Sequence, residues 1–118
     1  MNIESLQQYC LSKKGVEETL PFGPDVLVYK VAGKIFLLCP LDSGEFQFNV
    51  KCEPELAIEL REQYTCVLPG YHMSKKHWNT VLIDGSIPDK LLCQWIDESY
   101  QLVVGGLTKI QKTALETM

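Results

Sequence analysis

The chain has 118 residues, 11 basic and 15 acidic side chains, and a formal net charge of −4. This length is typical of one domain, and the acidic balance argues against a protein that binds nucleic acid through an overall positive surface. No apolar run is long enough to cross a membrane, and the first ten residues, MNIESLQQYC, lack the basic and apolar segments of a signal peptide. We therefore expect one cytoplasmic domain over residues 1–118, with residues 107–118 as a loosely attached tail or a short helix.

Hydrophobic periodicity and turn residues predict the elements in chain order. A helix is expected over 3–14, and the prolines and glycine of LPFGPD make 20–25 a loop. Strands are expected over 26–31, 34–39 and 45–51, with Ala32-Gly33 as a tight hairpin turn. Pro54 and Pro88 suit the first turns of helices over about 54–64 and 88–104, and two strands are expected between these helices.

The order helix, three strands, helix, two strands, helix predicts an α+β fold. Consecutive hairpins favour an antiparallel sheet. Each helix has a single apolar stripe, so the helices should cover one face of the sheet and form a two-layer sandwich. The runs over 26–31 and 34–39 are apolar on both faces, which predicts central strands.

The five cysteines do not form the pattern of a disulfide framework. Their number is odd, and no two of them form a CxxC pair. Free, mostly buried thiols in a reducing compartment are the simplest account of such a set. We therefore expect all five to be unpaired.

The segment GYHMSKKHWNTV, residues 70–81, is the candidate functional site. It lies within residues 63–83, which contain no Asp or Glu and carry two lysines, so this window is positive in an otherwise acidic chain. Lysines at a hairpin tip can neutralise phosphates, and an exposed tryptophan can stack on a base. The candidate nucleic-acid-binding residues are His72, Lys75, Lys76, His77, Trp78 and Asn79.

The same segment also fits a structural hairpin. In this interpretation Tyr71 and Trp78 pack inward, while His72 and Asn79 brace the loop through hydrogen bonds. If residues 77–83 form a strand, Trp78 shares one face with Thr80 and Leu82. We expect that face to be the core, because tryptophan is usually largely buried.

The sequence does not predict a metal site, a cofactor or a catalytic centre. Cys66, His72 and His77 have residue types that suit zinc, but their spacing provides no fourth ligand. The 63–83 window contains no acid to orient a cysteine–histidine pair, and no glycine-rich phosphate loop follows a strand. We expect a binding protein rather than an enzyme.

Five stretches closely resemble the MmcQ/YjbR family: PFG at 21–23, VYKVAGKIF at 28–36, VKCEPELAIELREQY at 50–64, PGYHMSKKHWNTV at 69–81 and SYQLVV at 99–104. The resemblance runs in order through nearly the whole chain. It implies a fold similar to that of secretion chaperones, α-β3-α-β2-α in two layers, and a small cytoplasmic bacterial protein without an established activity. It also implies a DNA-binding role through paired β-hairpin wings and the basic motif.

Two functions from different classes remain open. One is weak DNA binding by the hairpin-tip lysines, and the other is a protein-interaction or chaperone-like role of the open sheet face. If Lys34, Lys51, Lys75 and Lys76 share a surface without intervening acids, nucleic acid is favoured. If the exposed sheet face is broad and apolar, a protein partner is favoured. The sequence leaves the oligomeric state open.

Overall fold

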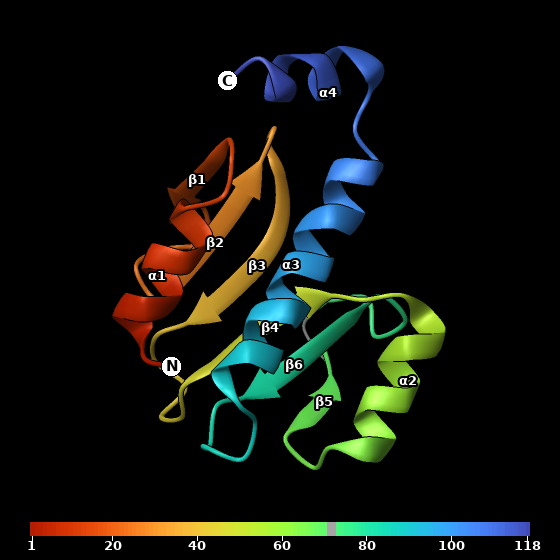
Figure 1. The fold of residues 1–118 in the computed structure, drawn as a ribbon. Coiled ribbons are helices and arrows are strands. Elements are labelled where there is room, and N and C mark those ends of the chain that lie inside the picture. The colour runs from red at the N-terminus through yellow and green to blue at the C-terminus, as the bar shows by residue number, and fades with distance from the viewer. Residues whose placement is uncertain (71–72) are drawn as a thin grey trace.

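The computed structural model describes residues 1–70 and 73–118, and its helices and strands are shown in Figure 1. In chain order they are α1 (Ile3–Leu11), β1 (Val16–Thr19), β2 (Val26–Val31), β3 (Lys34–Pro40), β4 (Gln47–Lys51), α2 (Pro54–Gln63), β5 (Val67–Pro69), β6 (Trp78–Leu82), α3 (Asp89–Gly105) and α4 (Lys109–Glu116). The predicted helices and strands are all present, with ends that differ by up to three residues. Strand β1 is an addition that the periodicity did not indicate.

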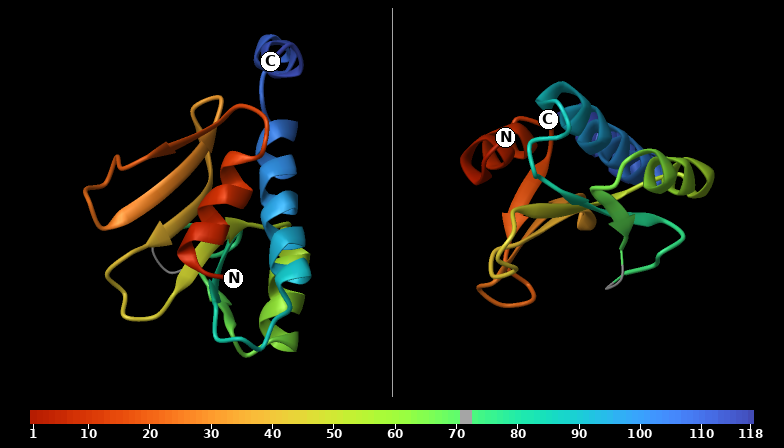
Figure 2. Two further views of the ribbon diagram at one scale, coloured as in Figure 1. Left: turned by 60° about the vertical axis from the view of Figure 1, so that its left-hand side comes forward. Right: turned by 90° about the horizontal axis from the view of Figure 1, so that it is seen from below.

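The six strands form one antiparallel sheet in the order β1-β2-β3-β4-β6-β5. Strands β2, β3 and β4 are consecutive antiparallel neighbours, which confirms the pairing expected for the three strands over 26–51. Helix α1 packs on β1, α2 on β5 and β6, and α3 on β2, β3 and β4. These three helices lie on the same side of the sheet (Figure 2). The predicted α+β two-layer sandwich is therefore confirmed.

The helix ends follow from local capping. The Asn2 side chain accepts a hydrogen bond from the Ser5 amide at 2.8 Å, and Ser5 Oγ accepts one from the Asn2 amide, so α1 begins with a capping box. Helix α1 ends at Leu11, three residues before the predicted end. Gly15 then adopts a φ of +74°, and a Cβ there would lie 2.5 Å from Leu115 Cδ1 of α4. The positive φ therefore favours glycine at position 15, and a side chain there would also displace the end of the Leu115 side chain.

The core lies between the helices and the helix-covered face of the sheet. Its fully buried side chains include Leu6, Tyr29, Phe36, Leu37, Phe48, Val81, Leu92 and Ile96. Ser99 of α3 is also buried, and its hydroxyl donates to the Phe36 carbonyl and accepts from the Lys51 amide. Because a buried hydroxyl is costly without partners, these two bonds explain how a polar residue joins α3 to two strands.

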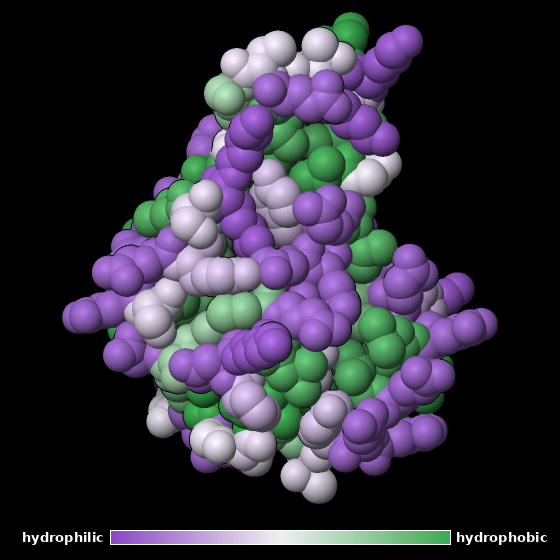
Figure 3. Space-filling model, in the orientation of Figure 1, coloured by the Kyte–Doolittle hydropathy of each residue, from purple (hydrophilic) through white to green (hydrophobic). Residues whose placement is uncertain are grey.

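The cysteines and the surface have the properties that the sequence led us to expect. All five cysteines are free, and four of them are buried. Among the described residues, no helix is both long and apolar enough to cross a bilayer. Viewed from the helix side, hydrophilic side chains cover much of the surface and hydrophobic ones form separate patches between them (Figure 3).

Candidate binding groove on the open face of the sheet

Strand β6 places the predicted site residues on two opposite faces of the sheet. Asn79 lies opposite Val50 in β4, and its side chain contacts α2, so it faces the helices. Trp78 lies opposite Lys51 on the open face and is 9% exposed. The expected burial of Trp78 is confirmed, but the expected face is wrong. Both faces of β6 carry apolar residues, so the alternation alone does not show which face is buried. The polar Asn79 lies on the core side because α2 supplies a hydrogen-bond partner for it.

That partner is Arg61, the only arginine in the sequence. Its Nε donates to Asn79 Oδ1 at 2.7 Å, and its terminal NH2 group donates to the carbonyls of Lys75 and, at 3.2 Å, of Trp78. The planar guanidinium can bridge these acceptors because its donors form a fixed fork. The Asn79 side chain bonds α2 rather than the loop, and the loop carbonyls are bonded by Arg61, the residue that sequence reasoning missed. Its one signal was a lone arginine in a glutamate-rich helix.

The structure separates the six candidate nucleic-acid-binding residues by exposure. Lys75, Lys76 and His77 have exposed side chains. Trp78 and Asn79 are buried, so neither offers a stacking face or an amide to a large ligand. His72 lies outside the described residues, as does Tyr71, which was expected to pack inward.

A hollow on the open face follows β3. Its volume is about 490 Å³, and it is lined by Phe22, Val26, Ile35, Leu38, Pro40, Asp42, Ser43, Gln47, Asn49 and Met73. Phe22 is 64% exposed at its rim. The ends of the sheet project away from the helices on either side of this face, which is therefore concave (Figure 2). We call this hollow the apolar groove.

A second depression continues the apolar groove toward the β2–β3 hairpin. It measures about 460 Å³ and is lined by Gly33, Lys34, Ile35, Lys51, Met73, Trp78, Leu102, Val103 and Gly106. It shares Ile35 and Met73 with the apolar groove. None of these lining residues is acidic, so Lys34 and Lys51 share an acid-free surface. We call this depression the lysine end.

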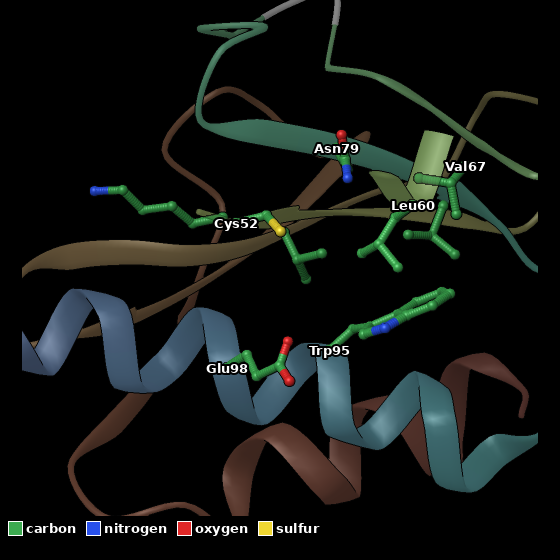
Figure 4. Close-up of a pocket in the computed structure, with 9 residues that line it drawn as sticks. Cys52, Leu60, Val67, Asn79, Trp95 and Glu98 are labelled. Atoms are coloured by element: carbon green, nitrogen blue, oxygen red, sulfur yellow. The ribbon is translucent and has the colours of Figure 1, made fainter. Parts of the chain in front are cut away.

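A small cavity lies on the other side of the sheet, between α2 and α3 (Figure 4). Its volume of about 10 Å³ has room for about one water. Burial, followed by the nearby carboxylates of Glu98 and Glu53, raises the pKa of the Cys52 thiol in its wall to about 11. A thiol with this pKa stays protonated at neutral pH and is a poor nucleophile.

The described residues contain no group of three or more His, Cys, Asp or Glu side chains that could hold a metal ion. Of the candidate metal ligands, the Cys66 side chain is buried and the His77 side chain is exposed. The two side chains therefore do not form a shared metal site. His72, the third candidate, lies outside the described residues.

The family model described as YjbR matches residues 11–102. The chain belongs to the YjbR family. Among YjbR-family relatives, YbdF of Escherichia coli O157:H7 is 39% identical over 106 residues, covering 90% of this chain and 87% of its own. YjbR of Escherichia coli K12 is 35% identical over 115 residues, covering 98% of each chain. Both relatives are described as uncharacterized proteins.

Solved structures share the YjbR-family fold. A Deinococcus radiodurans protein, described by the domain DUF419, has a TM-score of 0.90 and 34% identity, covering 98% of this chain and 88% of its own. A Pseudomonas syringae protein has a TM-score of 0.76 and 29% identity, covering 86% of this chain and 98% of its own. The YjbR match includes β3 and the loop before β6, so the apolar groove lies within the family region.

Proposed function

We propose that this YjbR-family protein is a binding protein rather than an enzyme, and that it holds a short segment of a protein partner in the apolar groove. The observation that carries this proposal is an uncovered apolar hollow of about 490 Å³ on the open face, with Phe22 64% exposed at its rim. Concave apolar surfaces with a few polar groups are typical of binding sites. The five free thiols support a reducing compartment, which we propose is the cytoplasm.

The shape and chemistry of the groove suit an extended peptide. The strand β3 runs from Lys34 to Pro40, six residue steps of about 3.3 Å, so the floor spans about 20 Å. An extended segment of about six residues has the same length. The Asn49 amide oxygen accepts from the Thr80 hydroxyl, which orients the Asn49 amide at the floor. Apolar side chains can fill the hollow while Gln47 and Asn49 bond the peptide backbone.

A peptide-display library screened against the purified protein tests this proposal. We expect wild-type protein to enrich sequences with a run of apolar residues. Phe22→Glu should abolish the enrichment, because it places a charge at the exposed rim with little effect on the core. The matched control is Ile58→Glu on α2, where the side chain is 53% exposed and lies outside the groove. No enrichment by wild-type protein, or equal enrichment by Phe22→Glu, would overturn the proposal.

A second candidate function is weak DNA binding, and the acid-free lysine end favours it. Lys34 and Lys51 line one depression, and Lys75 and Lys76 follow Met73, which lines the same depression. Few phosphates can be neutralised by so small a set, so the expected dissociation constant is about micromolar to 100 micromolar. Titration against single- and double-stranded DNA at several salt concentrations tests it. Absence of binding at low salt would remove this candidate.

A further inference from the structure

The two ends of the apolar groove carry opposite charges. We infer that the groove takes an apolar peptide in one orientation, with acidic residues that flank the apolar stretch placed at the lysine end. This inference rests on the proposed peptide-binding function and adds to it the chemical class of the partner segment. The occupant is therefore an apolar stretch with Asp or Glu side chains at one end.

The lysine end provides positive charge that no neighbouring acid in its wall neutralises. Lys34 has an exposed side chain at the start of β3, and Lys51 is half-buried at the end of β4. Lys51 is the cross-strand neighbour of Trp78, whose indole is buried. A lysine stem beside a tryptophan leaves the ammonium to reach toward solvent or a ligand. Two cations at one end of an apolar groove complement a short acidic run.

The opposite end of the groove is anionic. Asp42 and Ser43 line it beyond the end of β3, and Asp42 has an exposed side chain. The six residue steps from Lys34 to Pro40 separate the two ends by about 20 Å. This separation exceeds the Debye length of about 8 Å at physiological ionic strength, so the two charges do not cancel. An acidic flank is attracted at the lysine end and repelled at the Asp42 end, which fixes the orientation.

The same distribution favours a peptide over a nucleic acid in this groove. A bound strand carries phosphates along its whole length and stacks its bases on aromatic faces. The floor between the ends is instead formed by aliphatic side chains such as Val26, Ile35 and Leu38. Trp78 is 9% exposed and offers little stacking area. Positive charge at one end and a largely apolar surface between the ends fit an amphipathic peptide.

Three labelled peptides test the inference by fluorescence anisotropy. Each has the same six-residue apolar stretch, chosen from the display screen, followed by three Glu, three Gln or three Lys residues. Two exposed ion contacts should make the Glu peptide bind about tenfold tighter than the Gln peptide at low salt. The Lys peptide should bind more weakly than the Gln peptide. The Glu preference should shrink as salt is raised, while binding of the Gln peptide should not.

Variants of the protein test whether the preference for the Glu peptide depends on the lysine end. Lys34→Ala/Lys51→Ala should remove the Glu preference and leave the affinity for the Gln peptide unchanged. Lys90→Ala is the matched control, since this exposed lysine lies at the start of α3, at the opposite end of the helix from the lysine end. Phe22→Glu should weaken all three peptides together.

Each failure has a distinct meaning. Equal binding of the Glu and Gln peptides, or a Glu preference that survives Lys34→Ala/Lys51→Ala, overturns the orientation while the proposed function stands. No binding of any peptide, Gln included, overturns the proposed function itself. A ten-nucleotide single strand that displaces the Glu peptide at lower concentration than unlabelled Glu peptide, with loss in the double variant, overturns the peptide in favour of nucleic acid.

Discussion

Replacing Arg61 by alanine should destabilise the fold through the loop before β6. The guanidinium bonds the buried Asn79 side chain at 2.7 Å, as well as the carbonyls of Lys75 and Trp78. Asn79 is 1% exposed, so its Oδ1 cannot recover a water molecule easily once Arg61 is removed. The hydrogen bond that Asn79 Nδ2 donates to the Ala57 carbonyl is long, at 3.4 Å. Arg61 is therefore the main partner of this buried amide.

The magnitude follows from the cost of an unsatisfied buried acceptor. Leaving such a group unpaired costs about 1–3 kcal/mol, and the bonds to the two carbonyls are made by a half-buried group that solvent partly replaces. We expect Arg61→Ala to lower the free energy of unfolding by about 2–3 kcal/mol. For a domain of this size, that loss corresponds to a fall in Tm of roughly 8–15 °C. Arg61→Lys should recover part of the loss, because an ammonium lacks the fork that spans several acceptors.

Urea denaturation followed by tryptophan fluorescence measures the change, with the exposed neighbour Glu62→Ala as the control. The control should stay within about 0.5 kcal/mol of wild type. In an Asn79→Leu background, Arg61→Ala should cost much less than in wild type, because the acceptor has gone. A cost below about 0.5 kcal/mol in wild type, or an equal cost in both backgrounds, would refute the account of Arg61 as the partner of Asn79.

Three further predictions follow from burial, pKa and charge. Trp78→Ala should lower the free energy of unfolding by about 3–5 kcal/mol in chemical denaturation, and a change near zero would contradict its burial. Burial raises the pKa of the Cys39 and Cys52 thiols to about 11 from an ordinary 9. The stability that these protonated thiols contribute is therefore complete below pH 9 and is lost as the pH rises toward 11. The unfolding midpoints measured at pH 8, 9 and 10 should fall less steeply in Cys52→Ala than in wild type. If the protein binds DNA, Lys75→Ala/Lys76→Ala should flatten the slope of log affinity against log salt by about two without unfolding the chain, and an unchanged slope would move the site elsewhere.

The elements that sequence predicted well are those whose pattern is local. Ala32 and Gly33 have positive φ values of 50° and 77°, as the hairpin signal required. The alternation in β4 places Phe48 and Val50 in the core. Strand β1 was missed because VEET has one apolar residue, and its pairing with β2 comes from the partner strand. The formation of β1 is therefore a tertiary effect, and the hydrophobic periodicity of its own four residues does not predict it.

The site was harder to predict because its two decisive features are non-local. Apolar residues on both faces of β3 predicted a central strand, but they did not indicate which face would stay uncovered. The structure covers one side with α3 and leaves Leu38, Ile35 and Pro40 lining the apolar groove. The sequence pattern cannot tell a covered apolar face from an uncovered one. Likewise, the buried position of Asn79 depends on Arg61, which is 18 residues away in the chain.

These two features are linked through the loop that precedes β6. Arg61 lies on the helix side of the sheet and bonds the Lys75 carbonyl, two residues after Met73. Met73 lines both the apolar groove on the open face and the lysine end, which the C-terminal end of α3 also borders. Arg61, which also bonds the buried Asn79, therefore bonds the loop that forms one wall of the continuous groove. From the helix side of the sheet, the lone arginine of the chain thus bonds two carbonyls of the segment that forms one wall of the groove on the open face.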